Sequence, residues 1–280
     1  MRILIDAMSG DNAPLEIIKG AVMAASAFDC SITLIGDEDI ITGIAAENNL
    51  EINRSNISFA HAASVISMED NPLSVVRDKS DSSMAVGLKM LAEGEGDAFV
   101  SAGNTGALYA GSTLIVRRIK GVRKAAIATV MPFGRPMLML DCGANVELAA
   151  PAYLQLAQMG TIYMRSIFGI PSPEVGLLNI GAERTKGTKL LVEVYNMLEQ
   201  DPAINFKGNV EGKELPYGVC DVLVTDGFTG NIVLKLTEGC GSYIMHRIKD
   251  VFYKNVITKA SAMIVKSGMK KLKDDFSASQ

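Results

Sequence analysis

The sequence is poor in the residues on which many binding and catalytic sites depend. It contains no Trp, and aromatic residues account for only 6% of its composition, which excludes a nucleic-acid surface built from stacked aromatic rings. Its two histidines, His61 and His246, lie far apart in the chain. A catalytic Ser–His or Cys–His pair would have to use one of them, and a structural or solvated role is the better interpretation of both.

Cysteine spacing, charge and hydrophobic runs exclude further classes of protein. The four cysteines form no Cys-x-x-Cys pair, which indicates neither a disulfide framework nor a zinc site. The net charge of −4 disfavours general nucleic-acid binding. No apolar run approaches the ~18 residues that span a bilayer, and Asp6 interrupts the first apolar segment too early for a signal peptide. We therefore expect a cytoplasmic protein with no metal, no cofactor and no nucleic-acid partner.

Strand-like and helix-like segments alternate along the chain. Arg2–Asp6 has the pattern of a strand and precedes a helix that ends near Ala27, and a strand at Ser31–Gly36 precedes a helix in residues 37–48. This alternation is typical of a mostly parallel sheet covered by helices on both faces. We predict a three-layer α/β/α fold that forms one continuous domain over residues 1–280. Further strands are expected at Asp97–Ser101, Ala125–Met131, Met137–Leu140, Val175–Ile180 and Val219–Thr225, and further helices near Leu73–Ala92, Gly106–Arg118, Ala152–Phe168, Thr188–Glu199 and Gly230–Phe252.

Three polar, glycine-bearing loops each follow one of these apolar strands. They are Ser101–Gly106, Asp141–Asn145 and Asp226–Asn231. Ligands of open parallel sheets bind at the carboxyl ends of the strands, and a loop that opens a helix presents unpaired backbone N–H groups to an anion. The loops therefore predict a site for a phosphate-like group.

The segment at residues 243–273 differs from the rest of the chain. It carries eight basic residues and one acidic residue, Asp250, and we expect it to form a protruding amphipathic helix. Its apolar stripe forms either a core or dimer-packing face, or a face that lies on an anionic membrane surface. The stripe consists of Val256, Ile257, Ala260, Met263 and Ile264.

Several segments, in the same order over nearly the whole chain, resemble the bacterial phosphate acyltransferases of phospholipid synthesis. They are Asp6–Pro14, Asp81–Met84, Ser101–Leu108, Leu140–Asn145, Leu178–Gly181, Lys186-Gly187, Gly208–Gly212 and Asp226–Asn231. The resemblance implies a homodimer with an isocitrate-dehydrogenase-like or phosphotransacetylase-like fold that associates peripherally with membranes. It also implies transfer of a long acyl group from acyl carrier protein to inorganic phosphate, which gives acyl phosphate.

Two other functions stay open at this point. One is a phosphotransacetylase-like enzyme that uses a short acyl-CoA, and the other is an inactive, truncated scaffold at a membrane surface or in a dimer. A nucleotide-dependent dehydrogenase is disfavoured, because no Gly-x-Gly-x-x-Gly motif follows the first strand.

Three departures from the family pattern bear on the site. Ser9 stands where a second glycine is usual, which we expect to be tolerated if the backbone there avoids a positive φ. Ala182-Glu183-Arg184 stands where an acidic pair is usual, so one carboxylate is missing. The family normally continues with a Gly-Gly-Ala-Pro segment and a further strand that ends in His-Gly, so we expect a sheet without this C-terminal segment.

The chemistry selects the candidate phosphate ligands. Phosphate is itself the nucleophile and a thioester is a good acyl donor, so the enzyme must hold an anion and stabilise charge on the carbonyl oxygen. We predict that phosphate binds Gly103, Asn104, Thr105 and Gly106 through backbone N–H groups and the Thr105 hydroxyl, with Thr229 as a further ligand. A tight turn with Asn or Thr as helix cap is the structural alternative.

The predicted catalytic residues are Asn104, Lys186, Asp226 and Asn231. Lys186 is the candidate cationic clamp or else a surface lysine. Asn231 and Thr229 are candidate donors to the thioester oxygen, and Asp226, like Asp141, orients donors, handles a proton or only caps a helix.

A covalent acyl-enzyme on Cys142 is disfavoured, because a buried thiol is the commoner state of cysteine. A basic docking patch is expected for an acidic carrier protein, with a solvated turn as the alternative interpretation. The densest basic cluster outside the carboxyl end consists of Arg117, Arg118, Lys120, Arg123 and Lys124.

Overall fold

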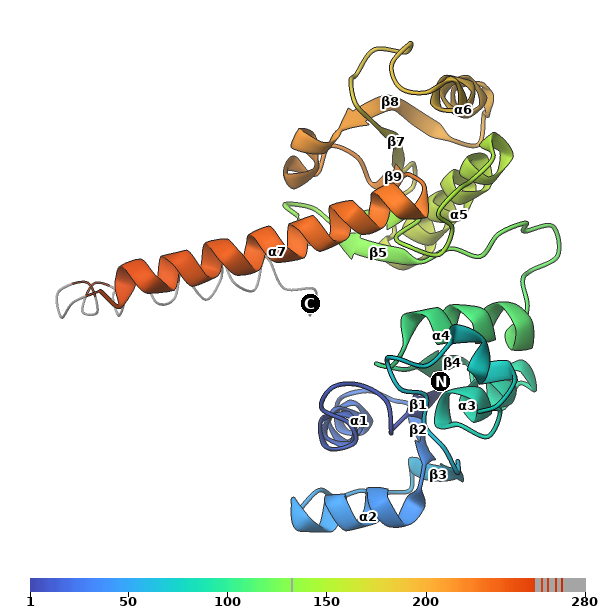
Figure 1. Cartoon of the computed structure of the whole chain (residues 1–280), viewed down its shortest axis with the longest axis vertical. Coiled ribbons are helices and arrows are strands. Elements are labelled where there is room, and N and C mark those ends of the chain that lie inside the picture. Colours follow the sequence, from blue (N-terminus) through green and yellow to red (C-terminus); the bar gives the residue numbers. More distant parts are fainter. Residues whose placement is uncertain (132, 255–257, 259–260, 262–264, 266–267, 269–280) are drawn as a thin grey trace. The chain divides into compact units, whose positions relative to one another are not determined.

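The computed structural model describes residues 1–131, 133–254, 258, 261, 265 and 268 (Figure 1). The chain divides into two compact units, Met1–Gly121 and Val122–Gln280, and each has a sheet of its own. Strands and helices alternate through this boundary without a Gly- or Pro-rich linker. For this reason the sequence pattern alone indicated one continuous body and not the point of division.

The first unit contains a four-stranded parallel sheet in the order β3-β2-β1-β4. Its strands are β1 Arg2–Asp6, β2 Ser31–Gly36, β3 Ile57–His61 and β4 Ala98–Val100. Its helices are α1 Leu15–Ala27, α2 Glu38–Glu47, the 3-10 helix η1 Pro72–Val76, α3 Ser83–Ala92, α4 Thr105–Gly111 and the π-helix η2 Ser112–Val116. One helix was predicted over Leu73–Ala92, but the structure has η1 and α3 there, because Ser82 caps a new helix through the N–H of Ala85.

Alternation of side chains along the strands produces the layers of this unit. Ile32 and Leu34 of β2 pack with α1 and α2, whereas Leu4 of β1 and Ile35 of β2 pack with α3. Successive residues of a strand point to opposite faces, so both faces of the sheet are buried. Figure 1 shows α1 and α2 on one side of this sheet and α3 on the other.

The second unit contains a five-stranded sheet in the order β5-β6-β9-β7-β8, in which only the edge strand β5 is antiparallel to its neighbour. Its strands are β5 Ala128–Met131, β6 Met137–Leu140, β7 Glu174–Asn179, β8 Asn205–Glu211 and β9 Val222–Val224. Its helices are α5 Ala150–Phe168, α6 Lys189–Gln200, the 3-10 helix η3 Gly212–Tyr217 and α7 Gly227–Phe252. The mostly parallel α/β architecture predicted from the sequence is confirmed.

Helices also cover both faces of the second sheet. Tyr153 and Leu156 of α5 pack with Val194 of α6 on one face, and Val233 of α7 packs on the other. The axis of α5 approaches the sheet closely, since a Cβ at Gly160 would lie 2.5 Å from a methyl carbon of Val222.

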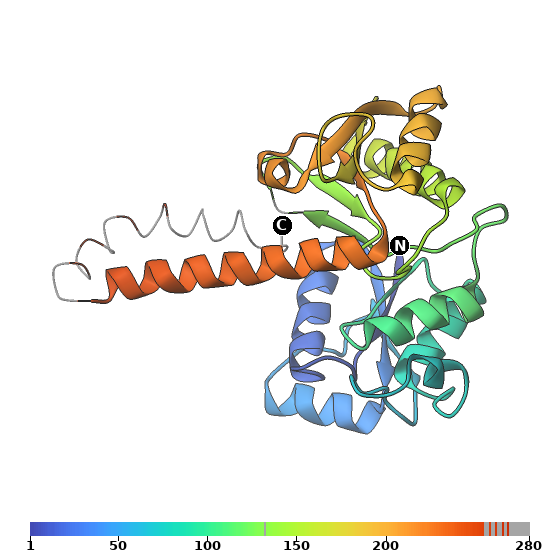
Figure 2. The ribbon, with the colours of Figure 1, turned by 45° about the horizontal axis from the view of Figure 1, so that its top comes forward.

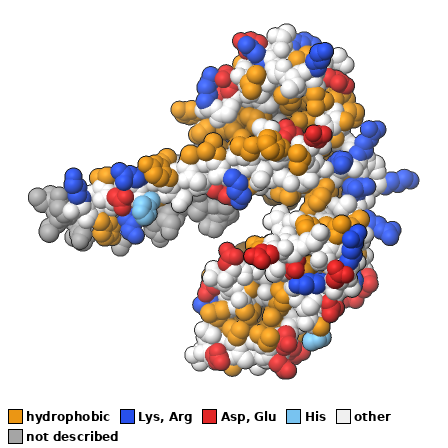
Figure 3. Space-filling view, in the orientation of Figure 1, with side chains coloured by type: hydrophobic (Ala, Val, Ile, Leu, Met, Phe, Trp, Pro, Cys, Tyr) orange, Lys and Arg blue, Asp and Glu red, His pale blue; other side chains and the backbone are white. Residues whose placement is uncertain are grey.

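Helix α7 extends far beyond the sheet of its own unit (Figure 2). From residue 231 onward none of its described residues is buried, and apolar side chains are visible along it in Figure 3. Of the protruding helical segment expected at residues 243–273, residues 243–252 therefore belong to α7. Residues Val256, Ile257, Ala260, Met263 and Ile264 of the predicted membrane stripe lie outside the described residues.

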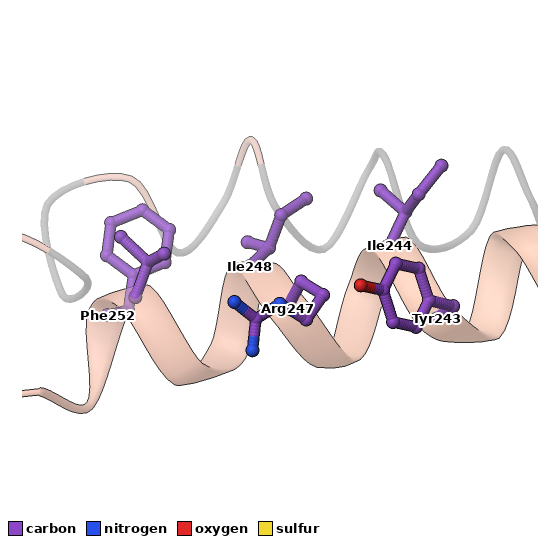
Figure 4. Close-up of a pocket in the computed structure, with 6 residues that line it drawn as sticks. Tyr243, Ile244, Arg247, Ile248 and Phe252 are labelled. Atoms are coloured by element: carbon purple, nitrogen blue, oxygen red, sulfur yellow. The ribbon is translucent and has the colours of Figure 1, made fainter.

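A shallow pocket lies on the distal part of α7 (Figure 4). It is lined by Tyr243, Ile244, Arg247, Ile248, Val251 and Phe252.

Within the described part of the chain, no helix has the length and apolar character needed to cross a bilayer.

Candidate active site

Asp6 holds two loops together at the carboxyl edge of the first sheet. It is the last residue of β1 and is fully buried. Its Oδ2 accepts a hydrogen bond from Ser101 Oγ at 2.8 Å, and its Oδ1 accepts one from the Met8 N–H at 3.3 Å. Ser101 Oγ in turn accepts the Gly103 N–H at 3.1 Å. Asp6 and Ser101 were not predicted as a pair, although both follow neighbouring parallel strands.

Close packing between these loops requires glycine at position 103. A Cβ there would lie 2.6 Å from the Cβ of Ser9 and 3.2 Å from the terminal methyl of Met84. Ser9 has no positive φ, whereas Gly10 has φ +118°, so the backbone condition under which serine was expected to be tolerated at position 9 is met. The Ser9 hydroxyl is buried and has no hydrogen-bond partner among the described residues.

The Asn104 side chain is engaged in structural contacts. Its Oδ1 accepts the Ala107 N–H at 3.0 Å and so caps α4. Its Nδ2 lies 3.2 Å from each of three carbonyl oxygens, those of Ser67, Met68 and Asp70. Because Asn104 is also buried, this geometry favours the capping alternative, and its predicted catalytic role stays a prediction.

Two residues of the predicted phosphate loop keep free donors. The Gly103 N–H is committed to Ser101, but the N–H groups of Thr105 and Gly106 in the first turn of α4 have no acceptor among the residues described. Thr105 is exposed, and its hydroxyl likewise has no partner in the described part of the chain. Unpaired N–H groups in the first turn of a helix are available as hydrogen-bond donors, and the phosphate-binding role of this loop stays a prediction.

In the second unit, Asp141 occupies the donors of its own loop. Its buried carboxylate accepts five hydrogen bonds, at 2.7–3.2 Å. They come from the N–H groups of Ile127, Gly143, Ala144 and Asn145 and from the Asn145 side-chain amide. The expectation that the Asp141–Asn145 loop presents unpaired N–H groups to an anion is therefore corrected: the protein supplies the anion itself.

Asp226 forms the N-terminal cap of α7. Its Oδ1 accepts the Thr229 N–H at 2.7 Å, and its Oδ2 accepts the Thr229 hydroxyl at 2.9 Å and the Tyr153 hydroxyl at 3.3 Å. Burial, together with the neighbouring Asp226 carboxylate, raises the pKa of Tyr153. The Thr229 hydroxyl thus gives its only proton to Asp226, which favours the capping alternative for both residues.

In the first turns of α7, the side chain of Asn231 is available to bind a ligand. It is exposed, and no described residue forms a hydrogen bond with its amide group. A Cβ at Gly143 would lie 3.6 Å from Asn231 Cγ, so the loop after β6 lies beside the first turns of α7. An amide N–H at this position is a donor for an oxyanion.

Lys186 lies on a loop that two asparagines hold in place. Asn179 Nδ2 donates to the Lys186 carbonyl oxygen at 3.1 Å and to Asn209 Oδ1 at 3.1 Å, and Asn209 Nδ2 donates to the Glu183 carbonyl oxygen at 2.8 Å. The Lys186 side chain is exposed and forms no ion pair with any described carboxylate. The hydrogen bonds fix the backbone of this loop, and the Lys186 ammonium group has no described carboxylate as partner. Both properties suit a residue that binds an anion.

Cys142 is unsuited to nucleophilic catalysis. Its Sγ donates to the Met139 carbonyl oxygen at 3.2 Å, and burial raises the pKa of its thiol to about 11. The thiol therefore stays protonated near neutral pH, whereas the thiolate is the reactive form.

Among the residues that the structure describes, no cluster of His, Cys, Asp or Glu could hold a metal ion.

All five members of the predicted basic cluster are exposed. Arg117, Arg118, Lys120, Arg123 and Lys124 form no ion pair with a carboxylate in the described ranges, and Figure 3 shows basic side chains gathered along this stretch. The segment is therefore an unneutralised positive surface.

Comparisons with known proteins show what this chain is similar to. A model of the family described as fatty acid synthesis protein matches residues 1–280. A phosphate acyltransferase of Acetivibrio thermocellus is 46% identical over 275 residues, which is 98% of this chain and 80% of the relative. A phosphate acyltransferase of Halothermothrix orenii is 44% identical over 278 residues, 97% of this chain and 81% of the relative.

Solved structures share the fold at low sequence identity. The EutD phosphotransacetylase of Staphylococcus aureus has a TM-score of 0.62 at 18% identity, and a phosphotransacetylase of Streptococcus pyogenes has a TM-score of 0.65 at 14% identity. Each comparison covers 86% of this chain and 82% of the other. The phosphotransacetylase-like fold expected from the sequence is confirmed.

Proposed function

The chain belongs to the family of fatty acid synthesis proteins, and from this premise we propose that it is a phosphate acyltransferase. It moves a long-chain acyl group from acyl carrier protein to inorganic phosphate, and the acyl phosphate formed serves phospholipid synthesis. The observation that carries this proposal is the 46% identity over 275 residues to a protein named phosphate acyltransferase.

The reaction requires positioned donors more than covalent groups. A phosphate oxygen attacks the thioester carbonyl carbon, the C–O bond forms, the C–S bond breaks, and the carrier leaves as a thiolate that takes up a proton. The protein lowers the barrier by holding phosphate in line and by stabilising negative charge on the carbonyl oxygen. A site with few titratable groups suits this chemistry.

We assign roles to the site residues according to which hydrogen-bond donors have no partner among the described residues. In the first unit, the N–H groups of Thr105 and Gly106 and the Thr105 hydroxyl bind phosphate. In the second unit, Lys186 binds an anionic group and Asn231 donates to the carbonyl oxygen of the acyl group. Support comes from the exposure of Thr105, Lys186 and Asn231 and from the absence of other partners among the described residues.

Other predicted site residues receive positioning roles in this proposal. Gly103 permits the close packing of its loop, Asn104 caps α4, and Asp226 with Thr229 caps α7. Capping fixes the first turn of a helix, where unpaired N–H groups lie.

The proposed partners follow from the charge of one segment and from the apolar stripe in the sequence of another. We propose that acyl carrier protein, an acidic partner, binds the basic segment Arg117–Lys124, which carries five cations and no acid. We further propose a homodimer and a cytoplasmic enzyme that associates peripherally with an anionic membrane through Val256, Ile257, Ala260, Met263 and Ile264.

The proposal is tested by incubating palmitoyl-carrier protein with the chain, with and without phosphate, and trapping acyl phosphate with hydroxylamine. We expect thioester consumption and hydroxamate only with phosphate. Consumption that is independent of phosphate would refute the assignment. Acetyl-CoA as donor tests the phosphotransacetylase alternative, and vesicle binding without turnover would support the inactive scaffold.

A further inference from the structure

Exposed apolar side chains gather at the carboxyl edge of the second sheet. Val146 is 64% exposed, Ile180 is 81% exposed and Phe228 is 58% exposed. They follow β6, β7 and β9, which are neighbours in the order β6-β9-β7. Leu140 and Leu177 both pair with Val224, so the segments that carry these three side chains leave the sheet at the same level.

The loops that bear Val146 and Phe228 are in direct contact. The Gly227 N–H donates to the Asn145 carbonyl oxygen at 2.8 Å, and a Cβ at Gly227 would lie 2.7 Å from that oxygen. Val146 and Phe228 are the next residues in sequence after this pair. Phe228 and Asn231 are spaced i, i+3 on α7, which places them on the same face of the helix.

Ile180 is held in its exposed position by hydrogen bonds. Its N–H donates to Asn179 Oδ1 at 2.8 Å, and Asn179 Nδ2 is bonded to the Lys186 carbonyl oxygen. Single exposed apolar residues are ordinary on protein surfaces. Several on one edge, carried by hydrogen-bonded loops, indicate a surface that binds something apolar.

A cation lies beside this surface. A Cβ at Gly181, which follows Ile180, would lie 2.9 Å from Lys186 Cγ, so the lysine stem packs along the backbone next to Ile180. The same Cβ would lie 2.9 Å from Glu183 Oε2, so a carboxylate is present here too, but it forms no ion pair with Lys186. The edge therefore combines apolar side chains with a lysine that is not paired with any described carboxylate. A molecule with an alkyl chain and an anionic head has the matching distribution.

We propose that Val146, Ile180 and Phe228 form the surface on which the alkyl chain of the acyl substrate lies. The acyl carbonyl group then lies toward Asn231, and the anionic head group lies toward Lys186. This inference rests on the proposed function and identifies which part of the protein selects for long acyl groups.

The test measures kcat/KM for butyryl, octanoyl, dodecanoyl and hexadecanoyl thioesters of acyl carrier protein. Phe228→Ser and Ile180→Ser should each lower the value for the hexadecanoyl donor about tenfold, equal to about 1.4 kcal/mol, and leave the butyryl donor unchanged. Ile167→Ser is the matched control, since Ile167 is 64% exposed near the far end of α5 in the same unit. Its profile should equal that of the wild type.

Equal losses with all donors, or no loss with any, would overturn the inference while phosphate-dependent turnover of the wild type upholds the proposed function. A wild type without phosphate-dependent turnover would overturn the proposed function itself. Calorimetric binding of dodecyl phosphate gives a readout independent of turnover. We expect about tenfold weaker binding by Phe228→Ser than by Ile167→Ser, and equal binding by the two would contradict the proposed surface.

Discussion

Replacing Asp141 by Asn removes the internal anion that organises the loop after β6. An asparagine keeps one acceptor oxygen and places an NH2 group where the other oxygen stood. If Oδ2 is replaced, the Asn145 backbone and side-chain N–H groups lose their acceptor, and if Oδ1 is replaced, three backbone N–H groups lose theirs. At least two buried hydrogen bonds to a charged acceptor are therefore lost.

Each hydrogen bond to a charged group contributes about 1.5–3 kcal/mol. The loss of two predicts that the free energy of unfolding of the second unit falls by about 3 kcal/mol or more. Far-UV circular dichroism in urea measures this change, because the chain has no Trp for fluorescence. Hydrogen exchange read by mass spectrometry should show faster exchange at Gly143–Asn145.

Glu147→Gln is the matched control, because Glu147 is exposed in the same loop. It should change stability by less than about 0.5 kcal/mol. An Asp141→Asn protein that is as stable as this control, with unchanged exchange, would refute the reasoning. The loop N–H groups would then be free for an external anion.

Three further predictions concern other positions. Gly103→Ala should destabilise the first unit by about 1–3 kcal/mol, measured by thermal unfolding, and the additional change Ser9→Gly should restore stability, because the new Cβ would clash with Ser9. Ser101→Ala should raise KM for phosphate several-fold more than it lowers kcat in steady-state assays, and an unchanged KM would contradict a positioning role. Burial raises the pKa of Cys142 to about 11, so the unfolded state loses this proton first and stability should fall as the pH rises from about 9 to 11. Cys142→Ala should make this fall less steep, and the buried Cys220, whose pKa is raised to about 12, should account for a remaining part of it.

The fold was largely predictable from hydrophobic patterning. The strand Met137–Leu140 has the predicted bounds, because four consecutive buried residues lie between turn residues. The strand Asn205–Glu211 was not predicted, because it is an edge strand whose side chains are mostly polar or partly exposed. Its pairing also shifts between Val175 and Gly176, which no local pattern indicates.

The site was predictable in position but less so in chemistry. Residue types located the loops at the carboxyl ends of strands, yet Asn, Asp and Thr are equally good helix caps and ligand donors. Which role each one has depends on partners distant in sequence, such as Ser67 for Asn104 and Tyr153 for Asp226. Sequence alone does not place those partners.

The central claim, that a phosphate oxygen attacks the acyl carbonyl carbon, is tested most directly with phosphate labelled in all its oxygens with oxygen-18. Mass spectrometry of the acyl phosphate formed from palmitoyl-carrier protein should show that every labelled oxygen is retained, with one acyl phosphate per thioester cleaved. Unlabelled free fatty acid as the only product would contradict the account.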